Sequence, residues 1–166
     1  MLRTIRPLGR WTLLLAMACL VVGRFAASPA AQTTSDVAVV VHPDVPVDTL
    51  TVSELRRVVL GDREFWPAGV RITLLIRAPI AHERDVVLKN LCQMSEAQFR
   101  QHWIGKVFRA DTALAPKIVY SPEMAADMVN RFPGAITFID ASLVAKGLKV
   151  VKIEGRAPGD KGYALR

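Results

Sequence analysis

Cysteine is nearly absent from the sequence, which has 166 residues and only two of them, Cys19 and Cys92. Cys19 lies in an N-terminal segment that we expect to be removed, so Cys92 has no partner for an intramolecular disulfide. The 135 residues that follow position 31 must therefore be stabilised by an apolar core. A chain of this size buries roughly two-thirds of its unfolded surface, and it predicts a single domain.

A run long enough to span a membrane is also missing. The uncharged run Trp11–Gly23 is shorter than the ~20 apolar residues that a transmembrane helix needs. Three arginines precede it and small residues follow it up to Ala31, which is the pattern of a secretory signal peptide. We predict that residues 1–31 are cleaved and that the protein is exported to the periplasm. A retained signal anchor is the alternative.

The sequence has no cluster of positive charge. It contains 22 Lys and Arg against 15 Asp and Glu, a net charge of +7. Removal of residues 1–31 takes away four arginines and no acidic residue, which lowers the net charge to +3. The remaining basic residues are interleaved with acidic ones, as on a solvated surface. We therefore predict no nucleic acid partner.

Motifs for catalysis and metal binding are missing as well. The chain has no G-x-S-x-G elbow, no Walker loop and no H-E-x-x-H. Its histidines and Cys92 show no close-set pair with the spacing of a metal site. Cys92 follows Leu91 in a helical pattern, where a buried, inert thiol is expected. We predict no catalytic residue, no metal and no cofactor; a hydrolase is kept only as a class that no residue supports.

Apolar runs alternate with helical patterns along the rest of the chain. The β-branched run Val37–Val41 suits a strand covered on both faces, as in a parallel sheet, and Arg71–Ile76 gives a second buried strand. "AITFI" and "LKVVKI" are further strands, and "KIVY" is too short to assign. This alternation predicts an α/β fold with a mostly parallel sheet flanked by helices. The domain should span residues 32–154, followed by a loose C-terminal tail at 155–166.

Several helix boundaries can be predicted from capping residues. Thr51 with Glu54 and Ser95 with Gln98 form capping boxes, and Gly61 lies where a helix C-cap belongs. A helix is expected at about residues 81–91. The helix after Ser95 should turn Phe99, Trp103 and Val107 inward, and Ser121-Pro122-Glu123 starts another helix.

The pair Trp66-Pro67 lies between a Gly-capped helix and a buried strand. Pro67 and Gly69 can turn the chain into the strand, and Trp66 can seal the helix end against the sheet. We favour this structural role; an aromatic that stacks on a ligand is the alternative.

Two long stretches carry a resemblance to a known family. They are "VAVVVHPDVPVDTLTVSELRRVVLGDREFWPAGVRITLL" and "FRQHWIGKVFRADTALAPKIVYSPEMAADMVNRFPGAITFID". Both resemble the phosphate-binding proteins of bacterial ABC transporters, which have an Asn/His-Pro turn, a T-x-x-E-L-R helix, Trp-Pro-x-Gly and, later, a P-G-A-I-G-Y strand. The likeness covers about residues 36–153. It implies one lobe of a type 2 periplasmic-binding-protein-like fold.

The resemblance also implies where an anion would bind, and the sequence departs from the family there. In the family an arginine followed by Ser-Gly-Thr leads into a helix whose backbone N–H groups hold phosphate. Arg77 matches that arginine, but "APIAHER" at residues 78–84 replaces the hydroxyl segment, and Thr137 stands where the family usually has glycine. The family has two lobes that close on the anion, whereas this chain has the length of one.

We predict a candidate anion site at Arg77, His82 and Arg84, around the start of the helix after the second strand. The alternative is that Glu83 and Asp85 pair locally with the two arginines. His42, after the first strand, is a further candidate for the same edge of the sheet.

Two functions follow from these observations. The first is a periplasmic solute-binding protein for phosphate or a similar oxyanion, with a membrane permease or receptor as partner. The second is a non-transport accessory or sensory module that binds proteins and has lost the ancestral anion site. A homodimer in which two chains supply both lobes of one clamp is compatible with the first.

Overall fold

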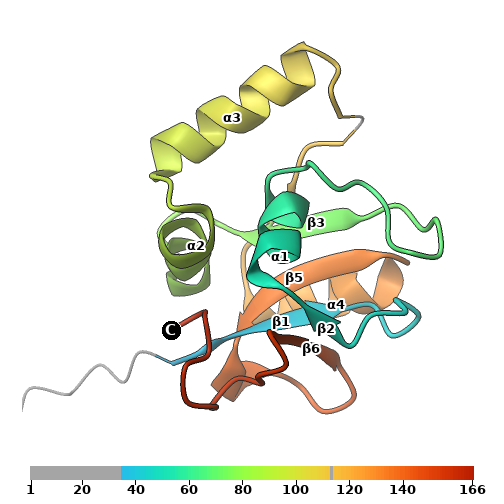
Figure 1. Cartoon of the computed structure of the whole chain (residues 1–166), viewed down its shortest axis with the longest axis vertical. Helices are drawn as coiled ribbons and strands as arrows, with labels where there is room; N and C mark the ends of the chain where they lie inside the picture. Colours follow the sequence, from blue (N-terminus) through green and yellow to red (C-terminus); the bar gives the residue numbers. More distant parts are fainter. Residues whose placement is uncertain (1–34, 113) are drawn as a thin grey trace, which may run out of the picture. The chain divides into compact units, whose positions relative to one another are not determined.

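The computed structural model describes residues 35–112 and 114–166, which form a six-stranded sheet flanked by helices (Figure 1). The predicted signal peptide at residues 1–31 lies outside the described residues. The strands are β1 (Val37–Val41), β2 (Thr49–Leu50), β3 (Thr73–Arg77), β4 (Lys117–Val119), β5 (Ala135–Asp140) and β6 (Lys149–Ile153). The helices are α1 (Val52–Val59), α2 (His82–Val86), α3 (Glu96–Phe108) and α4 (Pro122–Arg131), with a π-helical segment, Val87–Cys92, and a 3-10 turn, Ala141–Leu143.

The sheet is mixed, with the strand order β2-β6-β1-β5-β3-β4. β3 is parallel to β4 and β5, and β2 is parallel to β6, whereas β1 is antiparallel to both of its neighbours. Three of the five pairings are therefore parallel, and the predicted α/β fold with helices flanking the sheet is confirmed. β1 is buried on both faces as its apolar run predicts, but its neighbours run in the opposite direction.

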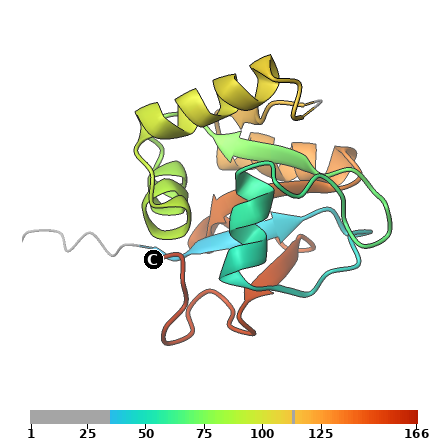
Figure 2. The same ribbon diagram turned by 45° about the horizontal axis from the view of Figure 1, so that its top comes forward.

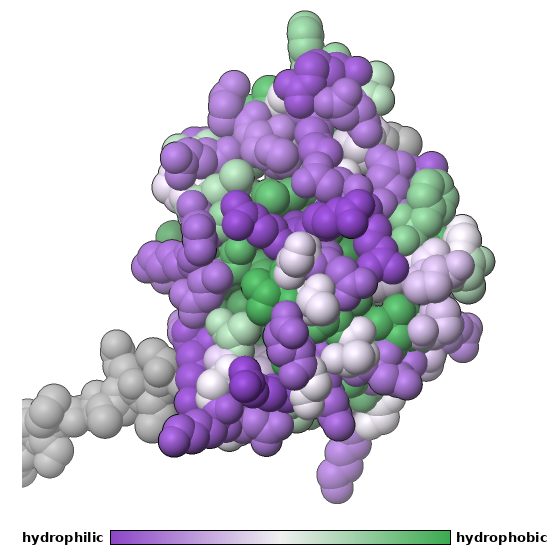
Figure 3. All heavy atoms as spheres, viewed as in Figure 1, coloured by the Kyte–Doolittle hydropathy of each residue, from purple (hydrophilic) through white to green (hydrophobic). Residues whose placement is uncertain are grey.

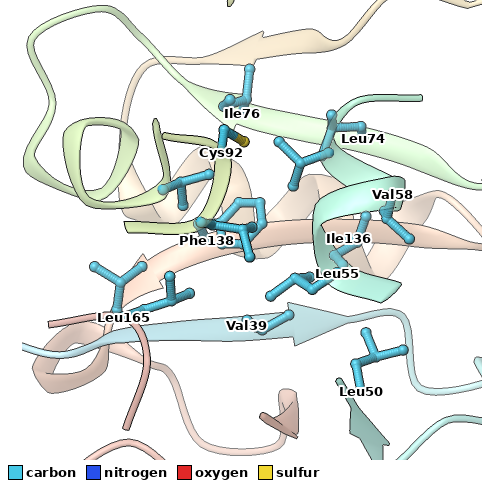
Figure 4. Packing of buried hydrophobic residues seen from close by; sticks show 14 of the residues in the cluster. Val39, Leu50, Leu55, Val58, Leu74, Ile76, Cys92, Ile136, Phe138 and Leu165 are labelled. Atoms are coloured by element: carbon cyan, nitrogen blue, oxygen red, sulfur yellow. The ribbon is translucent and has the colours of Figure 1, made fainter. Parts of the chain in front are cut away.

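The two faces of the sheet bury separate cores, because successive strand residues point to opposite faces. Val39 and Phe138 face the larger cluster, which lies under α1 and the π-helical segment (Figure 4). Val40 and Ile139 face the smaller cluster, which is covered by Val129 of α4. In the space-filling view, hydrophilic residues cover most of the face shown, and apolar residues show between them in its middle (Figure 3).

α1 begins and ends where the sequence predicts. The Thr51 side chain accepts a hydrogen bond from the Glu54 backbone, and the Glu54 carboxylate accepts one from the Thr51 N–H at 2.9 Å. Gly61 has a φ of +70°, the left-handed conformation expected after a helix. A Cβ at this position would lie 2.6 Å from Cη2 of Trp103, so glycine also allows α3 to approach α1.

Trp66 is a structural anchor, as predicted. It is only 2% exposed, and its Nε1 donates to the backbone oxygen of Gly134 at 2.9 Å. Its backbone N–H donates to the oxygen of Val70 at 2.8 Å, which closes the turn that leads toward β3. The indole therefore joins the turn before β3 to the turn before β5 and has no exposed face for a ligand.

The helices that follow β3 agree with the sequence predictions in their starting points but not at every buried position. α2 continues into the π-helical segment and ends at Gln93, which has a left-handed φ of 56°. α3 starts at the predicted capping box, and Phe99 and Trp103 are buried. Val107 was expected to point inward but is half exposed, because the last turns of α3 diverge from the sheet (Figures 1 and 2). Within residues 35–112 and 114–166, no helix is long and apolar enough to cross a membrane.

The C-terminal residues pack against the start of β1. Leu165 is fully buried and Tyr163 nearly so. The Val37 N–H donates to the oxygen of Leu165 at 2.8 Å, and the Tyr163 hydroxyl donates to the oxygen of Val37 at 2.9 Å. The prediction of a loose tail at residues 155–166 is therefore wrong, because two apolar side chains in an otherwise polar segment complete the core.

Candidate anion site

The carboxyl ends of three parallel strands meet at one edge of the sheet, which we call the carboxyl edge. β3 ends there at Arg77, β4 at Val119 and β5 at Asp140. Ligands of α/β sheets usually bind at such an edge. β1 is antiparallel to β5, with Val37 opposite Asp140, so β1 starts here. His42 follows the other end of β1 and lies at the opposite edge, contrary to expectation.

Arg77 is buried at the carboxyl edge and is held by a carboxylate of its own chain. Its Nε donates to Oε1 of Glu83 at 3.2 Å, and its Nη1 donates to the backbone oxygen of Val119 at 3.4 Å. Glu83 is buried too. The structure therefore contains the Arg77–Glu83 pair that is the alternative to an anion site, and the charge of this guanidinium is neutralised inside the protein.

Arg84 is engaged by a carboxylate of a different helix. Its Nε and Nη2 donate to the two carboxylate oxygens of Glu96 at 2.7 and 2.8 Å, and its Nη1 donates to the backbone oxygen of Arg77 at 2.8 Å. Glu96 is the first residue of α3, so this bidentate pair ties α2 to α3. Asp85, the local partner expected from the sequence, pairs with Lys89 instead. Arg77 and Arg84 are thus neighbours, but their guanidinium groups bind different carboxylates.

His82, the first residue of α2, lies near Asp140. Its Nε2 is 3.3 Å from the backbone oxygen of Ser35. Burial raises the pKa of Asp140, but hydrogen bonds from Ser142 and Ser35 and the charge of His82 outweigh burial and hold this pKa below its usual value. Asp140 is therefore ionised at neutral pH. Sequence reasoning missed it, although an acidic residue directly after an apolar run marks the end of a strand.

The start of α4 adds a further negative charge. The Ser121 side chain accepts a hydrogen bond from the Met124 N–H at 3.1 Å. A backbone hydrogen bond, the Ser121 side chain and the charge of Arg77 together lower the pKa of Glu123. The carboxyl edge therefore holds three carboxylates, Glu83, Glu123 and Asp140, beside Arg77 and His82. This distribution of charge opposes the approach of another anion.

Cys92 lies at the end of the π-helical segment, in the larger core cluster. Burial raises the pKa of Cys92 to about 11, with the charge of Arg56 opposing the shift. The thiol is buried, as expected. In the described part of the chain, no group of three or more His, Cys, Asp or Glu residues could hold a metal ion. Thr137 is buried in β5, and its hydroxyl has no partner among the described residues.

Comparison with known proteins identifies the architecture. No protein-family model matches the chain, and no curated protein matches it. An ABC-type phosphate transport receptor from Vibrio cholerae aligns with 75% of this chain at 22% identity and a TM-score of 0.61, over 48% of its own length. PstS from Borrelia burgdorferi aligns with 79% at 13% identity and a TM-score of 0.63, over 54% of its length.

The described domain has a periplasmic-binding-protein-like fold. A phosphate-binding protein from Stenotrophomonas maltophilia supports the same conclusion, with 12% identity, a TM-score of 0.55 and coverage of 75% of this chain and 40% of that one. At these identities the likeness shows the fold alone. The chain spans about half the length of the structures that it matches.

Proposed function

We propose that the protein is an exported accessory module, built on a periplasmic-binding-protein-like lobe, whose anion position is closed by ion pairs within the chain. One observation carries this proposal: Arg77 and Arg84 are buried and bound by Glu83 and Glu96. An anion that took Glu83's place on Arg77 would leave a buried carboxylate unpaired. Such a group costs several kcal/mol.

The proposed cellular setting follows from the N-terminus. A signal peptide at residues 1–31 would deliver the protein to the periplasm, where a membrane permease or receptor is the kind of partner we expect. The module acts by binding a protein and catalyses no reaction.

Capture of phosphate or a similar oxyanion is the competing function. It is supported by the fold shared with proteins named as phosphate receptors and phosphate-binding proteins. In that case Arg77, His82 and Arg84 would bind the anion, and two chains would supply the two lobes of one clamp.

Isothermal titration calorimetry of the exported protein with phosphate and sulfate separates the two functions. We expect no heat of binding at millimolar anion. A dissociation constant below about 1 mM, equivalent to roughly −4 kcal/mol, would overturn the closed-site proposal.

A matched pair of variants tests the role of Glu83. Glu83→Gln removes the carboxylate bound to Arg77 but keeps a similar shape, so this variant should gain measurable phosphate binding. Asp85→Asn removes a carboxylate two residues from Glu83 that pairs with the exposed Lys89, and this variant should gain no phosphate binding. Equal phosphate binding by the two variants would contradict the proposal that Glu83 closes the anion position.

A further inference from the structure

An apolar groove of about 550 Å³ lies between α3 and the strands β3 and β4. One wall is formed by Trp103, Ile104, Val107 and Phe108 of α3. Ile104 is 54% exposed and Phe108 is 89% exposed. The positions 104, 107 and 108 follow helical spacing, so these side chains form a stripe along one side of α3. Contiguous exposed apolar surface of this kind marks an interaction site.

α3 is held in place on the side away from the groove, which keeps the groove open. Nε2 of His102 is 2.8 Å from the backbone oxygen of Leu60. Nζ of Lys106 donates to the backbone oxygen of Gly61 at 3.1 Å and to Oδ1 of Asp62 at 2.6 Å. The Arg84–Glu96 pair fixes the start of the helix. These contacts hold α3 away from β4, so the groove is open in the structure without a partner.

The opposite wall contains the free edge of the sheet. β4 is the last strand in the sheet order, and it pairs with β3 on one side only. The oxygen of Val119 accepts a hydrogen bond from the N–H of Ala78, so Val119 points its backbone groups toward β3. Successive residues of a strand point these groups to opposite sides. The backbone N–H and C=O of Ile118 therefore point outward, and its exposed side chain lines the groove.

Positive charge is in excess around the groove. Arg84 and Glu96 line it and neutralise each other. Arg100 lines it too and has no ion-pair partner within residues 35–112 and 114–166. An occupant with an acidic side chain would be complementary to this rim.

We propose that this groove binds an extended apolar segment of a partner protein, which adds a strand to β4 and places a carboxylate near Arg100. A helix beside a free strand edge suits this mode of recognition, because backbone hydrogen bonds supply affinity and alternate side chains enter the apolar groove. The proposal rests on the accessory function proposed above and names the element of the partner that is recognised.

Peptide display on the full protein tests the groove. Random twelve-residue peptides selected against the immobilised protein should be enriched in alternating apolar residues with at least one acidic residue. Phe108→Glu and Ile118→Glu should each weaken binding of a selected peptide at least tenfold. Leu143→Glu is the control, because Leu143 is exposed and lies outside the groove, and this variant should bind normally. Failure to enrich any peptide, or equal binding to all three variants, would overturn the proposal.

N-methylation of the selected peptide tests strand addition directly. Methyl groups on backbone nitrogens at alternate positions should abolish binding, whereas methyl groups at the intervening positions should leave it unchanged. Arg100→Glu should shift the preference from acidic to basic peptides. An N-methyl scan with no alternation, or peptides whose apolar residues recur at helical spacing, would show a different occupant and overturn strand addition.

Light scattering distinguishes a second copy of the chain from a partner. We expect a monomer. A dimer that Ile118→Glu dissociates would assign the groove to self-association and overturn the proposal. Phosphate binding by the wild-type protein would defeat the closed anion site but would leave the peptide results unchanged, so the two proposals fail separately.

Discussion

The carboxyl edge and the groove border the same two strands, β3 and β4. Charged side chains are paired within the chain at the first, whereas apolar side chains are left exposed in the second. At the carboxyl edge, buried charges such as Arg77 are bound within the chain. In the groove, apolar side chains such as Phe108 face water. The difference follows from cost: a buried unpaired charge destabilises the fold by several kcal/mol, whereas an exposed apolar side chain forgoes about 2 kcal/mol. A buried charge must therefore be neutralised within the folded chain, whereas an exposed apolar side chain can be left for a partner to cover.

The largest effect should come from comparing two phenylalanines of the same helix. Phe99→Ala should lower the free energy of unfolding by about 3–5 kcal/mol, because Phe99 is buried against Trp103 and a cavity would remain. Phe108→Ala should change it by no more than about 0.5 kcal/mol, since Phe108 is exposed. Urea denaturation of both variants measures the difference. A large loss for Phe108→Ala would mean that the groove side of α3 is part of the core.

A smaller effect is expected from the ion pair that links the two regions. Arg84→Met should lower the free energy of unfolding by about 2 kcal/mol, because it removes a bidentate pair and the hydrogen bond to the Arg77 oxygen. Lys89→Met is the control: its pair with Asp85 is exposed, and its loss should cost less than about 0.5 kcal/mol. Similar midpoints for the two variants in urea would argue that Arg84 does not tie α2 to α3.

The smallest effect concerns Asp140 and pH. Its pKa in the folded protein lies below the usual value of about 3.9. The ionised carboxylate therefore adds stability that is fully present above about pH 4 and is lost as the pH falls through the lower, folded pKa. Asp140→Asn should show a smaller decrease in the free energy of unfolding between pH 7 and pH 3 than the wild type. Equal decreases would contradict the depressed pKa.

Local chemistry explains what could be predicted from the sequence. The capping boxes at Thr51 and Ser95 involve residues three positions apart, and Gly61 acts through its own backbone. Glu83 is six residues from Arg77, close enough for their pairing to be named as an alternative. Trp66 was recognised because proline and glycine follow it in a turn.

Features that depend on distant parts of the chain could not be predicted. The apolar run of β1 shows that the strand is buried, but its direction is set by β5 and β6, far along the chain. The pairing of Arg84 with Glu96 depends on how α2 packs beside α3, which the sequence alone does not show. The apolar side of α3 is wider than the part that is buried, so Val107 could not be told from a core residue such as Trp103. Tyr163 and Leu165 lie near the end of a polar segment, and nothing close to them in the sequence shows that they are buried.

The contact between Gly61 and Trp103 affects the width of the groove, because Trp103 also lines the groove. The indole lies so close to Gly61 that any side chain there would push against the ring. α3 would then tilt about its fixed start at Glu96, and the distance from Phe108 to β4 would change. Residue 61 thus sets the width of the groove, although it does not line the groove. Related sequences that differ at this position should select partner segments of a different thickness.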